Sequence, residues 1–253
     1  SAGTVGRAAA ADLIATHGFE AVALDPVPLP LAAWLRPARQ GGVLNVYIEG
    51  DGNAWESRYR ASTDPTPRDP LALRLAAADP SGAAVLYLGR PCQFATEPVP
   101  ACTPALWTDA RFSAPVIAAL GAAVDQVKVA QGADELVVIG YSGGGVAAAL
   151  LAAGRPDVRK LVTVAAPLDH AAWTAHHRVT PLTQSLTPMD RLAALAGIDQ
   201  VHFAGGRDVV VPLAVVRRYV NAQAAPEVRL RVMEDYDHAC CWAAAWPVLF
   251  GER

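Results

Sequence analysis

The stretch "VVIGYSGGGVAAALLAAG", residues 137–154, joins a short apolar run to an alanine-rich run through a cluster of glycines around one serine. A short apolar run that ends at glycine is typical of a buried strand, and an alanine-rich run favours a helix. The sequence therefore predicts a strand, a tight turn that carries Ser142, and a helix. Three glycines follow Ser142 directly, which indicates a close approach of backbone segments at this turn.

Strands and helices are predicted to alternate along most of the chain around this stretch. Strands are expected over residues 42–50, 83–89, 135–140, 158–166, 200–204 and 227–234, and helices over 70–79, 113–131, 143–153, 191–196, 212–222 and 239–250. This order implies a mostly parallel, doubly wound sheet with helices on both faces, a three-layer α/β/α sandwich. The runs "FEAVAL" and "LAAWL", at residues 19–24 and 31–35, are expected as antiparallel strands at the sheet edge.

Length and composition fit one globular domain over residues 1–253. Of these residues 53 % are hydrophobic and 18 % are charged, and the formal net charge is −3. A chain of this length can bury a sizeable core. No basic patch stands out, so nucleic acid is not an expected partner. No apolar run is long enough to span a bilayer, so stable membrane insertion is not expected.

Residues 167–190 do not fit the alternation. They carry Trp173, His170, His176 and His177, and they lie between an expected strand and an expected helix. We expect this segment to cross the end of the sheet as a small lid, and a plain irregular connection is the alternative. Two of the histidines are adjacent and no further ligand pattern follows them, so the sequence does not predict a metal site.

The residues around the serine match the pattern G-x-S-x-G, here Gly140-Tyr141-Ser142-Gly143-Gly144. In this pattern the serine takes a strained backbone conformation, and its neighbours two residues away must be small. The hydroxyl then stands above the sheet, close to the positive end of the helix that follows. A phosphate-binding turn is the alternative, but no lysine follows the glycines. The pattern therefore favours a nucleophilic serine, and Gly145 is expected to serve close packing of the helix on the sheet.

A serine hydroxyl needs a base, and the base needs an acid that orients it. His238, in "EDYDHACCW" between the last strand and the last helix, is the expected base, whereas His202 lies inside a strand and is expected to be packed there. Asp208, in "GGRDVVVP" after the preceding strand, is the expected acid, and it can also cap the helix that begins near residue 212. Asp169 is the alternative acid.

The serine turn, the aspartate turn and the histidine turn occur in the order Ser, Asp, His, and together they resemble the α/β-hydrolase superfamily. The resemblance covers residues 42 to the C-terminus. It implies an esterase- or lipase-like serine hydrolase that works without a cofactor or metal, through a triad of Ser142, His238 and Asp208.

The resemblance also implies two backbone N–H groups that form an oxyanion hole. One is that of Gly143, and the other lies in "YIEGDGNAW", residues 47–55, where Asp51 is the expected donor and Gly52 the alternative. Many members carry histidine at the position of Glu49. The Asp51 carboxylate is unusual near a site for negative charge, so we expect it to turn away or to bind an arginine such as Arg58 or Arg90.

The expected reaction is hydrolysis of a small-molecule ester, with short to medium acyl chains because the expected lid is short. Amide, peptide or thioester hydrolysis by the same triad and a non-catalytic binding role are the alternatives, since the fold alone does not select among them. Trp55, Tyr141, Phe94 and Trp173 are the expected pocket residues.

The four cysteines bear on the compartment. Cys92 and Cys102 flank a proline-rich loop, and Cys240 and Cys241 are adjacent. No C-x-x-C spacing for zinc is present. We expect either a Cys92–Cys102 and a Cys240–Cys241 pair or cross-pairing between the two sets, and four reduced thiols are the alternative. Disulfides would indicate export to a periplasmic or extracellular space, whereas reduced thiols would fit the cytoplasm.

Overall fold

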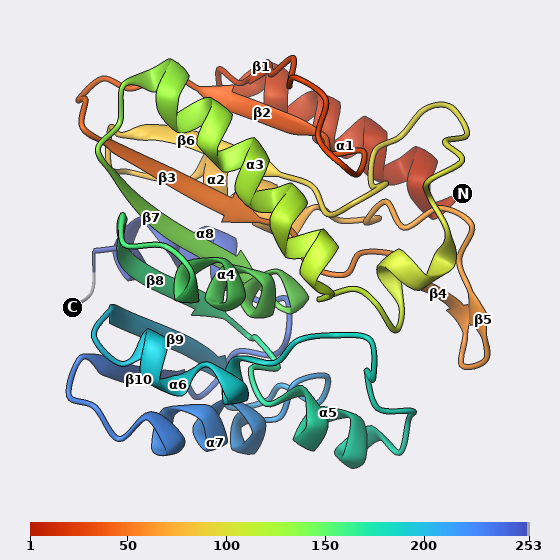
Figure 1. Ribbon diagram of the computed structural model, residues 1–253, viewed down its shortest axis with the longest axis vertical. Coiled ribbons are helices and arrows are strands. Elements are labelled where there is room, and N and C mark those ends of the chain that lie inside the picture. The colour runs from red at the N-terminus through yellow and green to blue at the C-terminus, as the bar shows by residue number, and fades with distance from the viewer. Residues whose placement is uncertain (252–253) are drawn as a thin grey trace.

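An eight-stranded sheet forms the centre of the protein in the computed structural model, which describes residues 1–251 (Figure 1). The strand order across the sheet is β1-β2-β6-β3-β7-β8-β9-β10. The strands are β1 (Glu20–Ala21), β2 (Ala33–Arg36), β3 (Val43–Ile48), β6 (Ala84–Leu88), β7 (Glu135–Tyr141), β8 (Val158–Val164), β9 (Asp199–Gly205) and β10 (Val228–Met233). A separate hairpin pairs β4 (Trp55–Ser57) with β5 (Arg60–Ala61). The last two residues of the expected 1–253 domain lie outside the described residues.

The pairing of the strands confirms the predicted mostly parallel sheet. All pairs from β6 through β3, β7, β8 and β9 to β10 are parallel. The edge strands β2 and β1 are antiparallel, as the sequence predicts. Every residue of β6 is buried. Parallel strands covered on both faces lack the alternation of apolar and polar residues, which is why they read as continuous apolar runs in the sequence.

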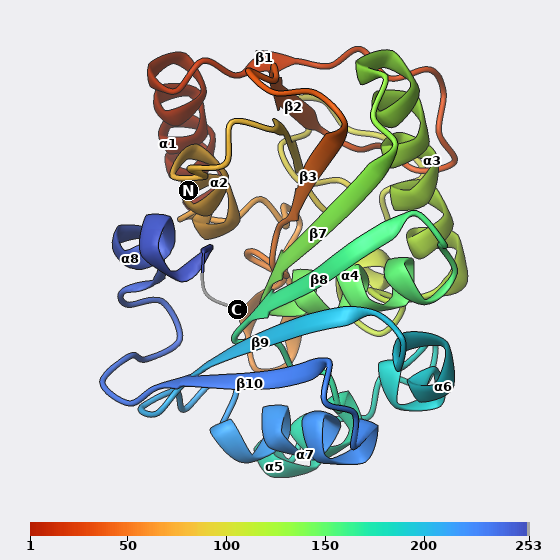
Figure 2. The same ribbon diagram turned by 90° about the vertical axis from the view of Figure 1, so that its left-hand side faces the viewer.

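Helices cover both faces of the sheet and complete the predicted three layers (Figure 2). One face carries α1 (Ala2–Thr16), α2 (Leu71–Ala77) and α8 (Trp242–Leu249), and the other carries α3 (Ala114–Gln131), α4 (Gly143–Ala153), α6 (Leu192–Leu195) and α7 (Leu213–Gln223). Each face has its own apolar cluster. Leu120 and Tyr219 belong to the cluster beneath α3 and α7, and Leu73 and Trp246 belong to the cluster beneath α2 and α8.

Helix α1 is not among the predicted helices, because two glycines lower the helix propensity of its first turns. The structure gives a reason for both glycines. A side chain at Gly3 would collide with the carboxylate of Asp64, and one at Gly6 would collide with the backbone carbonyl of Pro67. The glycines thus allow α1 to pack closely against the loop that follows the β4–β5 hairpin.

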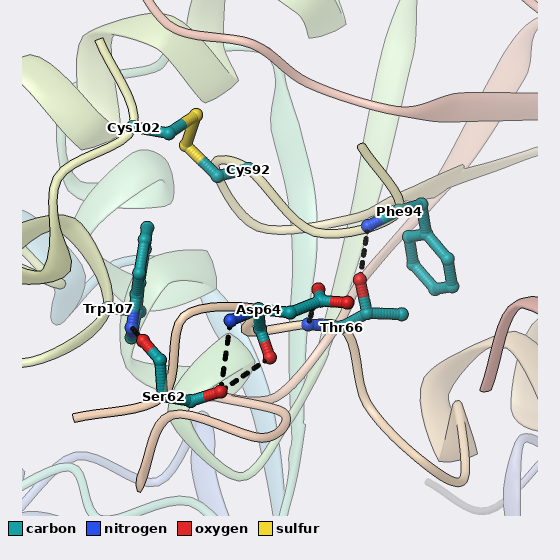
Figure 3. The surroundings of a disulfide bond; sticks show 7 residues. All are labelled: Ser62, Asp64, Thr66, Cys92, Phe94, Cys102 and Trp107. Atoms are coloured by element: carbon teal, nitrogen blue, oxygen red, sulfur yellow. Dashed lines mark hydrogen bonds between the residues drawn. A yellow bond between two sulfur atoms is a disulfide. The ribbon is translucent and has the colours of Figure 1, made fainter. Parts of the chain in front are cut away.

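A disulfide between Cys92 and Cys102 closes the loop after β6, with the two Cα atoms 5.9 Å apart (Figure 3). Trp107, on the short helix η1 (Pro104–Trp107), packs beside it and donates its indole N–H to the carbonyl of Ser62 over 3.0 Å. The disulfide therefore braces the β4–β5 hairpin region. Cys240 pairs with Cys241, so of the two expected pairings the structure has Cys92–Cys102 with Cys240–Cys241 and not the cross-pairing.

The carboxyl ends of the parallel strands point toward one end of the molecule, where β4, β5 and α5 (His170–His177) lie (Figure 1). Residues 167–190 form α5, an irregular stretch and the short helix η2 (Pro188–Asp190). Helix α5 contacts α7 at the edge of the sheet. Loops that follow parallel strands meet at this end, which is where α/β sheets place their functional groups.

Candidate active site

Ser142 occupies a strained turn between β7 and α4. Its backbone angles are φ 51° and ψ −125°, a region that costs about 1–3 kcal/mol for a residue other than glycine. The Ser142 N–H donates to the carbonyl of Val164 over 2.8 Å, which anchors the turn to β8. A side chain at Gly140 would collide with the carbonyl of Gly144, and one at Gly144 would collide with the carbonyl of Ile48. The two glycines of the G-x-S-x-G pattern are therefore required by backbone contact.

The third glycine after the serine, Gly145, brings α4 close to the sheet. A Cβ atom at this position would lie 2.5 Å from the Cβ of Ala166 and 3.1 Å from the Cβ of Thr163. Both distances are shorter than ordinary contacts between carbon atoms. The absence of a side chain at Gly145 therefore allows the close helix–sheet packing that was expected.

His238 and Asp208 are joined by a hydrogen bond of 2.8 Å between the imidazole Nδ1 and a carboxylate oxygen. The other oxygen of Asp208 accepts the N–H groups of Val210 and Val211 at 2.9 and 2.8 Å. The Asp208 side chain is fully buried, whereas that of His238 is 20 % exposed. The carboxylate thus holds the Nδ1–H tautomer and leaves Nε2 as the open acceptor. The same aspartate orders the turn before α7, so its two expected roles are compatible.

The backbone of His238 is held by two donors from neighbouring elements. The Tyr141 hydroxyl donates to the His238 carbonyl over 2.9 Å, and the Trp242 indole N–H donates to it over 3.1 Å. Burial raises the pKa of Tyr141 well above its ordinary value, so this hydroxyl stays a donor. The residue just before the serine therefore positions the histidine loop.

A cavity of about 510 Å³ opens at this point, and both Ser142 and His238 line it. Three of the expected pocket residues, Trp55, Tyr141 and Trp173, line it as well. The expectation for Phe94 is wrong. Its ring packs edge-on against Trp34 and Tyr87, with ring centres 5.3 and 6.2 Å apart, because the Cys92–Cys102 loop turns back over β2 and β6.

Asp51 forms an ion pair with two arginines in the loop after β3. Nη1 of Arg90 lies 3.2 Å from one carboxylate oxygen, and Nη1 of Arg111 lies 2.5 Å from the other. Burial raises the pKa of Asp51, but the two guanidinium groups outweigh it and lower the pKa below its usual value. The expected arginine partner is correct for Arg90 and wrong for Arg58, which instead donates to the carbonyl of Arg178. Arg111 is a second partner that was not expected, because no local sequence pattern marks it.

The Asp51 carboxylate lies against the Cα of Gly143, so a side chain at Gly143 would collide with it. The backbone N–H groups of Gly143, Asp51 and Gly52, the expected oxyanion donors, have no hydrogen-bond partner within residues 1–251. Asp51 and Gly52 line the cavity of Ser142. Two guanidinium groups and one carboxylate leave this cluster with one net positive charge, which offsets the carboxylate beside these N–H groups.

Glu49 is a buried carboxyl group at the start of the same loop and is 1 % exposed. The Tyr87 hydroxyl donates to it over 2.7 Å, and the N–H groups of Gly50 and Ala72 donate to it over 2.9 and 3.3 Å. Burial raises its pKa from 4.5 to about 7, because these hydrogen bonds only partly offset the loss of water. Glu49 thus ties the loop to β6 and to the first turn of α2.

The remaining candidates from the sequence lie elsewhere. Asp169 accepts the N–H of Ala172 at the start of α5 and pairs with Arg218, so the structure does not bring it to His238 as the acid. His202 is fully buried between Thr163 and Gln200, and burial lowers its pKa to about 3. In the described part of the chain, no group of three His, Cys, Asp or Glu side chains could hold a metal ion. None of the helices within residues 1–251 has the length and apolar character needed to cross a membrane.

Comparison with known proteins relates this fold to serine hydrolases and esterases. No protein-family model matches the sequence, and no curated protein sequence is similar to it. An α/β serine hydrolase homologue from Coxiella burnetii superposes with a TM-score of 0.60 at 18 % identity, over 91 % of this chain and 93 % of its own. An esterase domain from Rhodothermus marinus gives 0.61 at 17 %, over 91 % and 95 %, and an esterase from Pyrococcus furiosus gives 0.64 at 15 %, over 95 % and 91 %. The chain therefore has the α/β-hydrolase fold.

Proposed function

We propose that this protein is a serine hydrolase that cleaves carboxylic esters through an acyl-enzyme on Ser142. The observation that carries the proposal is the meeting of three chain segments at one pocket. Ser142 follows β7 in a strained turn, and His238 follows β10 and lines the same cavity. Asp208 follows β9 and is hydrogen-bonded to His238. The serine hydrolases and esterases that share the fold support the same reaction class.

In the proposed reaction, the hydroxyl of Ser142 attacks the ester carbonyl while Nε2 of His238 takes its proton. Asp208 stabilises the resulting imidazolium through Nδ1 and holds the ring in place. The protonated His238 then gives the proton to the departing alcohol, and an acyl group remains on Ser142. Water, activated by His238 in turn, attacks this acyl group and releases the acid, which restores the free serine.

The proposed oxyanion hole consists of the backbone N–H groups of Gly143 and Asp51, with Gly52 as the alternative to Asp51. A good donor of this type contributes about 3–4 kcal/mol to transition-state stabilisation. The N-terminus of α4 adds a positive dipole end at Gly143. Acyl chains of short to medium length remain our expectation, since the cavity around Ser142 measures only about 510 Å³.

Covalent labelling tests the proposal. Wild-type protein should react with a fluorophosphonate probe and hydrolyse p-nitrophenyl acetate, and both activities should be lost in Ser142→Ala. Ser185→Ala is the matched control, because this serine only bonds the backbone at Asp109 and Phe112. Equal labelling of wild type and Ser142→Ala would show that the serine is not the nucleophile.

The same machinery could serve amides, peptides or thioesters, and a non-catalytic binding role is the candidate of another class. Matched acetyl substrates with p-nitrophenol, p-nitroaniline and a thiol as leaving groups rank the first three. A protein that resists the probe and turns over none of these substrates would favour the binding role.

We infer export from the Cys92–Cys102 pair, whose Cα separation of 5.9 Å suits a disulfide. Disulfides persist in oxidising compartments and are rare in the cytosol. Titration of free thiols in the unfolded, unreduced protein tests this inference. Four free thiols would overturn it.

A further inference from the structure

A second and larger cavity, of about 920 Å³, adjoins the pocket of Ser142. Its walls come from the β4–β5 hairpin, the end of α5 and the stretch 178–183. Trp55, Arg111, Trp173 and Val210 line both cavities. The two spaces therefore meet at these four residues, and a molecule that reaches Ser142 can extend into the larger one.

The larger cavity carries apolar side chains that are open to solvent. Trp55 is 44 % exposed, Val179 39 % and Val209 78 %. Pro181 and Leu182 also line it. Exposed apolar residues gathered in one concave region are typical of a ligand-binding surface.

The charges in this cavity are mostly positive. Arg58, Arg111 and Arg178 line it, whereas Asp109 is its one carboxylate among the described lining residues. The protein as a whole has a net charge of −3, whereas arginine outnumbers acidic residues in the lining of this cavity. A positive cavity attracts anions and raises their local concentration.

Arg111 stands where the two cavities meet and is 5 % exposed. Its Nε donates to the carbonyl of Thr108 over 2.6 Å, and its Nη1 donates to Asp51. No hydrogen bond joins its Nη2 to another group among residues 1–251, and Nη2 is not a fully buried atom, so it can be reached from the cavity. Together with Arg90 and Asp51 it leaves one net positive charge in a buried cluster. A buried charge of this kind is stabilised by a partner of opposite sign.

We propose that the larger cavity binds the apolar chain of a medium-chain carboxylate whose carboxylate group pairs with Nη2 of Arg111. This inference rests on the proposed function in one respect: such an amphipathic anion is then a part of the ester substrate or the acid that hydrolysis releases. Nη2 offers a charged donor to the carboxylate, and the chain beyond it covers the apolar wall.

Binding is measured without turnover, by titrating Ser142→Ala with carboxylates and following the total tryptophan fluorescence, in which Trp55 and Trp173 line the cavity. Butyrate, hexanoate, octanoate and decanoate are compared below their micellar concentrations, with decanamide as the neutral counterpart of decanoate. Affinity should rise by up to about fourfold for each methylene that becomes buried. Decanoate should bind roughly 10–100-fold more tightly than decanamide, as expected for a hydrogen bond to a charged group.

Two variants locate the site. Val179→Trp fills the larger cavity and should weaken decanoate binding by at least about tenfold, which is the effect of a contact of roughly 1.4 kcal/mol. Val5→Trp is the matched control, because Val5 is similarly exposed at 47 % and lines neither cavity. Arg111→Lys keeps the charge, but a single ammonium group cannot bind Thr108 and Asp51 and also take the place of Nη2. This variant should lose most of the preference for decanoate over decanamide, and far-ultraviolet circular dichroism verifies its fold.

The outcomes separate this inference from the proposed function. Equal binding of butyrate and decanoate, equal binding of decanoate and decanamide, or equal effects of Val179→Trp and Val5→Trp would each overturn the inference. The same holds if Arg111→Lys slows p-nitrophenyl acetate hydrolysis but leaves decanoate binding unchanged, since Arg111 would then serve the reaction and not the ligand. Failure of Ser142 labelling with intact decanoate binding would instead reject the proposed hydrolase.

Discussion

Glu49 makes the stability of the protein depend on pH in a way that one substitution can remove. Burial raises its pKa from 4.5 to about 7 in the folded state. The folded protein therefore binds this proton more tightly than the unfolded chain does. The resulting stabilisation is fully present below pH 4.5 and is lost as the pH rises through about 7. A pKa rise of this size corresponds to roughly 3 kcal/mol in the free energy of unfolding.

Glu49→Gln removes the titration and can keep the hydrogen bonds. The amide oxygen can accept the N–H groups of Gly50 and Ala72, and the amide nitrogen can donate to the hydroxyl of Tyr87. At pH 5 the variant should have nearly wild-type stability. At pH 8 it should be the more stable protein by roughly 3 kcal/mol, because wild type then holds an ionised carboxylate in its interior.

Urea unfolding at pH 5 and pH 8, followed by tryptophan fluorescence, measures this difference. Glu97→Gln is the matched control, because Glu97 is exposed on the Cys92–Cys102 loop and its charge stays in water. Its substitution should change stability equally at both pH values. If Glu49→Gln and wild type differ by the same amount at pH 5 and pH 8, the carboxyl titrates normally and the reasoning from burial is wrong.

Three further predictions concern the serine turn and its partners. Asp208→Asn should lower kcat/KM for p-nitrophenyl acetate by about 10³–10⁴-fold, because its amide nitrogen faces the Nδ1–H of His238 and cannot accept that hydrogen. The variant should lose little stability, because its amide oxygen can still accept the N–H groups of the turn before α7. Tyr141→Phe should cost about 1 kcal/mol in urea unfolding and lower kcat/KM less than about tenfold, because one of two donors to the His238 carbonyl remains. Gly145→Ala should destabilise the protein by about 1–3 kcal/mol, because the added methyl group overpacks the contact between α4 and the sheet. Gly154→Ala, with open space around the added atom, should be neutral or slightly stabilising, and urea unfolding measures both glycine variants.

The parts of the fold that could be predicted from the sequence depend on short-range patterns. The G-x-S-x-G turn could be predicted because Gly140 and Gly144 face backbone atoms that leave no room for a side chain. The parallel strands could be predicted because burial on both faces gives continuous apolar runs in the sequence. The Asp208–His238 hydrogen bond could be anticipated because each residue lies in the loop after one of two neighbouring strands, β9 and β10, which pair side by side.

The parts that could not be predicted depend on contacts between distant segments. Arg111 meets Asp51 across 60 residues of sequence, and the residues around it carry no local sign of that contact. The ring of Phe94 could have pointed toward the cavity of Ser142, and it packs on Trp34 because of the path that the disulfide-closed loop takes. Helix α1 could not be predicted because Gly3 and Gly6 lower its helix propensity, and the reason for these glycines is close packing against a loop about 60 residues away.

The carboxylate of Asp51 is unexpected beside the proposed oxyanion donors, and its two arginine partners account for it. A lone carboxylate there would repel the developing negative charge. Two guanidinium groups reverse the sign of the cluster, and the carboxylate in turn lets both arginines stay buried beside each other. Asp51 is therefore best understood as the residue that holds Arg90 and Arg111 in place. Removal of the Asp51 carboxylate should leave two buried guanidinium groups that repel each other and displace the loop. We therefore expect the loss of this negative charge to slow the proposed reaction.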